Sequence, residues 1–247
     1  MQRVSIIIPC YNAVRTLARA LDSCLAQAQA GQIIVVDDCS DDGSREVAAY
    51  YALKDARVIL LRMPENGGPA KARNLAAQHA AFPVLAFLDA DDEYLPNAVS
   101  DASSFLHANP LQPAVRLDVQ YAGFPSEIYA FSDFEKLAAN MSDTVTSSLV
   151  MRRAVFLALG GFPIDENFRQ FGGEDSAMFQ AIVEIYGCFR MVDRQRVRMH
   201  YHSASHVARY FYRGMGVLET PDHEKRAFRE AAERFLQNAR KSVWQGD

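Results

Sequence analysis

The sequence predicts an α/β fold in which a mostly parallel, Rossmann-like sheet is flanked by helices and followed by a C-terminal helical segment. Three observations support this prediction. Short apolar runs alternate with helical patterns through about the first hundred residues, as in the βαβ units that build parallel sheets. Two of these apolar runs end directly in acidic residues. From Ser205 onward, apolar residues recur at the spacing of one helix face.

The first half of the chain contains four predicted strands with helices between them. Apolar runs without charge indicate buried strands, and the segments between them place their apolar residues on one helical face. Asn12 is predicted to cap the first helix, and Gly31 to end it. The predicted strands are 4–9, 33–36, 58–61 and 84–88, and the two later helices are 44–53 and 70–80.

The second half alternates less regularly. We predict strands over 115–121 and 144–151, and helices over 131–139 and 176–186, the last ended by Gly187. The glycines and proline of 160–163 indicate a loop. One apolar stripe runs along the C-terminal segment and consists of Phe228, Ala231, Ala232, Phe235, Leu236, Ala239 and Val243.

Composition narrows the class of protein. The 247 residues carry a net charge of −4, which gives no reason to expect a nucleic-acid partner. Four scattered cysteines without a C-x-x-C pair favour a reduced, cytoplasmic protein. No apolar run approaches the roughly 18 residues of a membrane span, and none resembles a signal peptide. The aromatic-basic run 209–213 leaves peripheral association with the inner face of a membrane open, and the C-terminal stripe leaves a homodimer open.

Carboxylates gather at the ends of two predicted strands. Asp89, Asp91 and Asp92 follow the strand 84–88, and Asp38 belongs to an acidic run after 33–36. Each run alone also fits a polar loop with a helix cap. Together they would face one crevice, because ligands bind at the carboxyl ends of strands in open α/β sheets. Since Mg2+ and Mn2+ prefer carboxylate oxygens and offset their repulsion, we predict a metal site that holds a phosphate-bearing ligand.

A glycine-containing segment, Asn66-Gly67-Gly68-Pro69, leads into a predicted helix that carries Lys71 and Arg73. Glycines let the backbone approach a ligand closely, and proline suits the first turn of a helix. A helix N-terminus with basic side chains nearby attracts phosphate. The segment lacks the spacing of a Walker A loop, and alone it also fits a tight loop before a solvated basic helix.

The chain resembles family 2 glycosyltransferases in four segments, which match the family in their order, their spacing and their position relative to the predicted strands. These segments are 4–12, 36–44, 66–74 and 88–92. The resemblance covers about the first hundred residues and implies a GT-A fold with a nucleotide-sugar donor. It divides the chain into a catalytic domain, 1–205, and a C-terminal helical segment, 206–247. Within the catalytic domain, 1–100 is expected to bind the nucleotide sugar and 101–205 to face the acceptor.

The resemblance also assigns donor-binding residues. Tyr11 is expected to lie against the donor base and Asp38 to hydrogen-bond it, while Arg73 is expected near the ribose or phosphates. Asp89 is expected to contact the ribose or the sugar. The full expected donor-binding set is Pro9, Tyr11, Asp38, Asn66, Gly67, Arg73 and Asp89.

Metal ligands follow from two matching motifs. Asp89-Ala90-Asp91 matches the family's D-x-D motif, in which Asp91 would ligate Mn2+ or Mg2+. Asp92 would support this site or act as a second ligand. Residues 198–205 match an Arg-x-His-x-x-Ser-x-Ser pattern, which makes His200 a candidate ligand for the metal or the diphosphate, with His202 as the alternative.

The predicted catalytic residues are Asp175 and Glu174, which form the Glu-Asp motif of the acceptor-side segment. Asp175 would be the general base that removes a proton from the acceptor hydroxyl. An acidic residue beside a helix start is also a common cap, so this pattern alone leaves a structural role open.

The resemblance therefore implies an inverting enzyme that transfers one sugar from a nucleoside-diphosphate sugar, with UDP favoured. The acceptor would be a hydroxyl on a glycan, a lipid-linked sugar or another molecule, in bacterial surface polysaccharide or glycoconjugate synthesis. Processive relatives carry transmembrane helices and a Q-x-x-R-W motif, which we do not find, so single additions are expected. Two alternatives are a nucleotidyltransferase, although Pro9-Cys10-Tyr11-Asn12 replaces its glycine-rich loop, and an inactive sugar-nucleotide-binding subunit.

Overall fold

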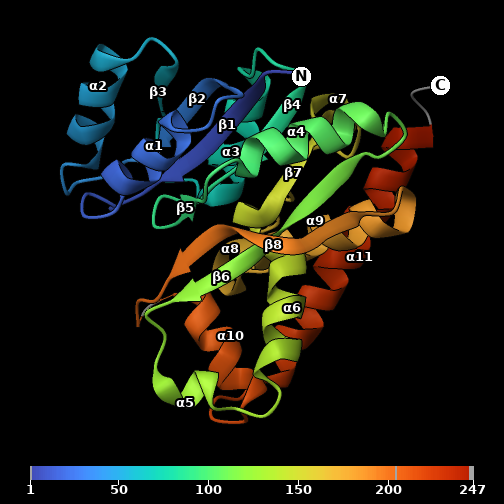
Figure 1. Ribbon diagram of the computed structural model, residues 1–247. Coiled ribbons are helices and arrows are strands. Elements are labelled where there is room, and N and C mark those ends of the chain that lie inside the picture. Colours follow the sequence, from blue (N-terminus) through green and yellow to red (C-terminus); the bar gives the residue numbers. More distant parts are fainter. Residues whose placement is uncertain (1, 204, 245–247) are drawn as a thin grey trace.

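The computed structural model describes residues 2–203 and 205–244, and within them eight strands form one mixed sheet (Figure 1). The strand order is β3-β2-β1-β4-β7-β6-β8-β5. Pairs β3–β2, β2–β1, β1–β4 and β6–β8 are parallel, whereas β4–β7, β7–β6 and β8–β5 are antiparallel. The strands are β1 (Val4–Cys10), β2 (Ala30–Asp37), β3 (Val58–Arg62), β4 (Val84–Phe87), β5 (Glu93–Tyr94), β6 (Ala114–Ala122), β7 (Leu149–Arg152) and β8 (Phe189–His200).

Helices cover both faces of this sheet, which confirms the predicted α/β class. They are α1 (Leu17–Leu25), α2 (Ser44–Lys54), α3 (Pro69–Gln78), α4 (Ala98–Ala108), α5 (Ser126–Tyr129), α6 (Phe134–Thr144), α7 (Arg153–Ala158), α8 (Glu166–Phe171), α9 (Glu174–Ile185), α10 (His206–Gly214) and α11 (Asp222–Trp244). The C-terminal helix α11 packs along α9 and α8 (Figure 1). The C-terminal helical segment was predicted over 206–247. The structure describes this segment up to residue 244, so residues 245–247 lie outside the described residues.

Alternating side chains of the central strands build two hydrophobic cores. Ile6 and Ile8 of β1 pack with Leu21 of α1 in the core on one face of the sheet. Ile7 and Phe87 point to the opposite face and pack in a second core with residues of α3, α7 and α9. Because successive strand residues point to opposite faces, a strand covered on both sides is a continuous apolar run. This explains why β1, β2 and β4 were predictable from the sequence.

Two predicted helix boundaries are wrong. Asn12 does not cap a helix, because its side-chain Oδ1 accepts a hydrogen bond from the N–H of Asp41 at 3.0 Å, and α1 begins only at Leu17. Gly31 does not end that helix but lies within β2. A Cβ at this position would lie 2.5 Å from Cε2 of Phe82, so glycine is needed there for close packing.

The second half differs more from the prediction. The expected strand 144–151 is wrong up to Ser148, because α6 extends to Thr144 and Thr146–Ser148 form a 3₁₀ turn, and only its last three residues lie in β7. The Ser148 hydroxyl donates to the carbonyl of Val145 at 2.8 Å and thereby supports this turn. The helix expected over 131–139 is α6, which begins three residues later and extends to Thr144. The long strand β8 was not predicted.

Among the described residues, no helix has both the length and the apolar character that crossing a bilayer requires.

Candidate active site

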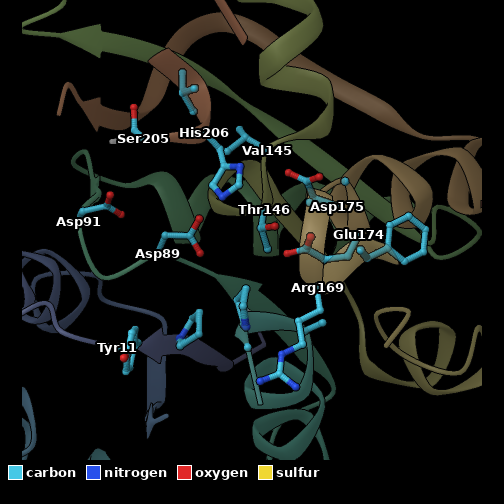
Figure 2. A pocket seen from close by; sticks show the side chains of 18 of the residues that line it. Tyr11, Asp89, Asp91, Val145, Thr146, Arg169, Glu174, Asp175, Ser205 and His206 are labelled. Carbon is cyan, nitrogen blue, oxygen red and sulfur yellow. The ribbon is translucent and has the colours of Figure 1, made fainter. Parts of the chain in front are cut away.

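One large cavity, with a volume of about 1890 Å³, lies at the carboxyl ends of β1, β2 and β4. Every site residue predicted from the sequence lines it, namely Pro9, Tyr11, Asp38, Asn66, Gly67, Arg73, Asp89, Asp91, Asp92, Glu174, Asp175, His200 and His202. Figure 2 shows Asp89 facing Glu174 across this cavity, with Asp91 and Tyr11 on the side of Asp89. The fold thus brings residues from both halves of the chain into one site.

Asp38 fixes the glycine segment at the start of α3. Its carboxylate is 3% exposed, and its two oxygens accept hydrogen bonds from the N–H groups of Gly67 and Gly68, both at 2.7 Å. Asn66 Nδ2 donates to the carbonyl of Asp38 at 3.1 Å. Each carboxylate oxygen has a further lone pair, which leaves acceptor capacity for a ligand. Tyr11 beside it is 55% exposed, so its ring is open to contact from the cavity.

Arg73 connects the two halves of the site. Its guanidinium is 4% exposed, and it donates to Oδ1 of Asp89 at 2.5 Å and to Oε1 of Glu174 at 3.3 Å. It also lies over the ring of Phe162, 5.3 Å from the centroid. Burial alone would lower the pKa of Arg73, but attraction to Asp89 and Glu174 raises it. A buried cation therefore holds the D-x-D segment and the Glu-Asp segment together.

The D-x-D segment presents its carboxylates differently. Asp91 faces the cavity, and its carbonyl accepts from Arg19 Nη2 at 2.5 Å. Asp92 is 2% exposed and accepts a hydrogen bond from the Ser147 hydroxyl at 2.6 Å. Burial, together with the neighbouring Asp91 and Asp89, raises the pKa of Asp92 well above its usual range. Asp92 thus lies behind Asp91, in a position to support the segment.

The two histidines at the end of β8 have different partners. His200 Nε2 lies 3.1 Å from Oε1 of Glu93, which also accepts from Arg198 at 2.8 Å. His202 Nε2 lies 2.9 Å from Oδ2 of Asp91, and this hydrogen bond raises the pKa of His202. The structure therefore brings His202, the alternative of the two, to the D-x-D segment.

A divalent metal at this site would depend on few protein ligands. In the part of the chain that the structure describes, no group of three or more His, Cys, Asp or Glu side chains is arranged as a metal site. Asp91 and His202 form a mixed oxygen–nitrogen pair at the cavity, a donor set that suits Mn2+. Such metals commonly take one or two protein ligands and complete their shell with substrate phosphate oxygens and water. The pair therefore fits a metal that is held jointly with a phosphate ligand.

The Glu-Asp motif lies at the start of α9. Gly173 precedes it with a φ of 101°, a left-handed conformation that favours glycine. Oδ1 of Asp175 accepts from the N–H of Ser176 at 2.7 Å. Burial and the neighbouring Glu174 raise the pKa of Asp175 to about 6, although Ser176 and Arg73 oppose this shift. A carboxylate with such a pKa is suited to proton transfer near neutral pH.

Two residues of the site were not predicted. The Ser147 hydroxyl accepts from the N–H of Asp89 at 3.0 Å and donates to Asp92, so it orients the D-x-D segment. No local pattern marks it, because it lies 55 residues or more from both partners. His206 points into the cavity in Figure 2, and burial and Arg209 lower its pKa. The sequence signal that could have identified His206 is its position in a short segment that also contains His200 and His202.

Comparisons with known proteins identify the family. A family model described as "Glycosyl transferase family 2" matches residues 5–160, and a second, "N-terminal domain of galactosyltransferase", matches residues 127–203. The first match covers more than half of the chain. The chain therefore belongs to glycosyl transferase family 2, which confirms the resemblance seen in the sequence.

Particular relatives match over part of their length. The succinoglycan biosynthesis protein ExoU of Rhizobium meliloti is 41% identical over 101 residues, which cover 41% of this chain and 30% of ExoU. The UDP-Glc:alpha-D-GlcNAc-diphosphoundecaprenol beta-1,3-glucosyltransferase WfgD of Escherichia coli is 36% identical over 107 residues, which cover 43% of this chain and 42% of WfgD. The matched region thus spans less than half the length of these relatives.

The fold is shared with solved glycosyltransferases. The mannosyltransferase PcManGT from Pyrobaculum calidifontis, solved in complex with GDP-Man and Mn2+, superposes with a TM-score of 0.67 at 20% identity. The superposition covers 98% of this chain and 74% of PcManGT. The GT-A fold expected from the sequence is thereby confirmed.

Proposed function

We propose that this chain is an inverting, non-processive glycosyltransferase that moves one sugar from a UDP-sugar to an acceptor hydroxyl. The observation that carries the proposal is the Asp89–Arg73–Glu174 network, which joins the donor-side and acceptor-side carboxylates within one cavity. Family membership gives the reaction class. The network explains how this chain can hold both reactants at one place.

Each side of the site has a separate task in this proposal. Tyr11 and Asp38 bind the nucleotide base, and Asp89 contacts the ribose or the sugar. Asp175 removes the proton from the acceptor hydroxyl as that oxygen attacks the anomeric carbon. One base that activates one attacking hydroxyl fits a direct displacement, and the family resemblance implies that this displacement inverts the anomeric centre. Glu174 keeps Arg73 in place and so orients the start of α9, which carries Asp175.

A divalent metal completes the proposed site. Asp91 and His202 would hold Mn2+ or Mg2+, which as a Lewis acid stabilises the negative charge of the departing diphosphate. The GDP-Man and Mn2+ in the PcManGT complex support this proposal. UDP is favoured as the nucleotide because WfgD carries UDP-Glc in its name. ExoU, a succinoglycan biosynthesis protein, supports a role in bacterial polysaccharide synthesis.

The pH dependence of the reaction follows from Asp175. Its pKa of about 6 means that the ionised, proton-accepting form increases as the pH rises through 6. We therefore expect kcat/KM for the donor to rise about tenfold per pH unit below 6 and to level off above 7. The measurement is nucleotide release from the UDP-sugar between pH 4.5 and 8 in buffers of constant ionic strength. A flat profile over this range would show that Asp175 is not the base.

The nucleotide and the metal can be identified by one binding experiment. UDP, GDP, dTDP and CDP are compared for their effect on the melting temperature, each with and without Mn2+. Ligands that bind the native state raise its stability by about 2.7 kcal/mol at 100 times Kd. We expect the largest rise with UDP and Mn2+ together, and a much smaller rise in Asp91→Ala. Equal rises with and without Mn2+ would contradict the metal site, and no rise with any nucleotide would contradict the proposed function.

A further inference from the structure

Four basic side chains line the active-site cavity from the C-terminal helices. Arg209 and Arg213 lie on α10, and Lys225 and Arg229 lie on α11, all four exposed. The two residues of each pair are four positions apart, so each pair occupies one face of its helix. We refer to these four residues as the basic wall. The same cavity is also lined by the carboxylates of the D-x-D segment.

The basic wall contains cations that lack carboxylate partners. Within the described ranges, neither Arg209 nor Arg229 has an ion pair, whereas Arg234 and Arg240 farther along α11 pair with Asp165 at 2.7 Å and with Glu184 at 2.6 Å. Among the described residues, Arg229 therefore lines the cavity without an ion pair, and Arg226, on α11 outside the cavity, has none either.

The remaining two residues of the wall have weak pairs. Arg213 lies 3.8 Å from Glu224, and Lys225 lies 3.0 Å from Asp222, which is 93% exposed. Exposed pairs of this kind contribute little to stability. The wall therefore presents net positive charge to the cavity.

The position of the wall places it on the acceptor side. Phe228, between Lys225 and Arg229 on α11, packs against Gly173, where a Cβ would lie 2.6 Å from the ring carbon Cε2. Gly173 directly precedes the Glu-Asp motif. The residues proposed to bind the nucleotide base, by contrast, lie at the ends of β1 and β2. In the sheet, these two strands lie on the side of β4 that faces away from β7. A ligand group at the wall is thus next to the residue proposed to activate the acceptor.

We propose that the basic wall binds a phosphate group of the acceptor, so that the acceptor is a phosphate-bearing molecule. Arginine suits this task because its planar guanidinium donates two parallel hydrogen bonds to phosphate oxygens. The wall also offsets the repulsion that an anionic acceptor meets from the carboxylates of the site. A sugar linked to a lipid through a diphosphate and a polymer linked by phosphodiesters share this chemistry. This inference rests on the proposed function, since it assumes that an acceptor reaches Asp175.

The test is calorimetric titration of phosphate-bearing and neutral probes in the presence of saturating UDP and Mn2+, which occupy the donor site. One probe is N-acetylglucosamine linked through a diphosphate to a geranyl chain, and the other is a short glycerol phosphate oligomer. The neutral controls are methyl N-acetylglucosaminide and glycerol. We expect at least one phosphate probe to bind more tightly than its neutral control, and the tighter of the two probes identifies the source of the phosphate.

Two variants and a matched control assign this binding to the wall. Lys225→Gln/Arg229→Gln and, independently, Arg209→Gln are expected to weaken binding of the phosphate probe roughly tenfold or more, because each removes charge-assisted hydrogen bonds to the phosphate. Arg226→Gln removes the same charge from α11 outside the cavity and is expected to change the affinity less than about twofold. Unchanged melting temperatures in all variants show that the fold is retained.

Each other outcome overturns the inference. If the wild-type protein binds UDP but neither phosphate probe, the wall does not bind phosphate and the proposed function still stands. If the variants weaken the binding of UDP as strongly as the binding of the probe, the wall binds the diphosphate of the donor. If Arg226→Gln weakens binding of the probe as much as the wall variants do, the loss of affinity reflects only the net charge of the protein. If no nucleotide binds, the proposed function fails together with the inference.

Discussion

Replacing Asp175 with asparagine is expected to slow nucleotide release from the UDP-sugar by about 10²–10⁴-fold, the usual contribution of a positioned general base. Asparagine keeps the size of the side chain and can still accept from the N–H of Ser176, so the start of α9 remains intact. It cannot take a proton from the acceptor hydroxyl or from water. The rate is measured with the donor alone, since slow hydrolysis also needs an activated oxygen.

Two controls separate loss of the base from loss of the fold or of the donor site. UDP binding is expected to be unchanged in Asp175→Asn, because Asp175 does not contact the proposed base-binding residues. Glu166→Gln removes a negative charge from another residue of the same cavity and is expected to leave the rate within about twofold. Equal rates for Asp175→Asn and the wild-type protein would rule out the assigned base.

The second large effect is expected for Arg73→Met, which we predict to lower the free energy of unfolding by about 3–5 kcal/mol. Removing one partner of a buried ion pair leaves the other charges without compensation. Here the loss affects both Asp89 and Glu174, whose carboxylates face each other across the cavity. Methionine fills a similar volume, so the loss reports the charge more than a void. Urea denaturation measures the change.

A rescue variant tests the cause of this loss. Adding Asp89→Asn and Glu174→Gln to Arg73→Met removes the uncompensated charges and is expected to restore at least half of the lost stability. Arg73→Lys keeps the charge but not the planar fork that reaches both carboxylates, so its stability should fall between the two. If Arg73→Met unfolds at the wild-type urea concentration, the network does not hold the two segments together.

The first half of the fold was predictable because three of its four long strands, β1, β2 and β4, are buried on both faces. Val84–Phe87 and the central residues of β1 and β2 are completely buried, so each strand is an unbroken apolar run. Strand β8 lacked this signal, because its first half is largely exposed and carries Arg190, Asp193 and Arg194. It forms through parallel pairing with β6, a contact between distant segments that a local pattern does not reveal.

The membership of the site was predictable, but its internal connections were not. The rule that ligands bind at the carboxyl ends of strands placed Asp38 and Asp91 at one edge of the sheet. The bond from Arg73 to Glu174 joins residues 101 positions apart, and nothing near Arg73 in the sequence indicates that partner. The choice between His200 and His202 depends on where β8 ends, and this strand was itself not predicted.

The most direct test of the central claim is the identity of the products formed from a UDP-sugar by the wild-type protein and by Asp175→Asn. Phosphorus NMR distinguishes UDP, which forms when the bond between the sugar and the diphosphate breaks, from the products of cleavage within the diphosphate. With Mn2+ removed by chelation before each spectrum, we predict that UDP accumulates with the wild-type protein and at least about 10²-fold more slowly with the variant. Cleavage within the diphosphate, or equal UDP release by both proteins, would contradict the assignment of this cavity as a glycosyl-transfer site.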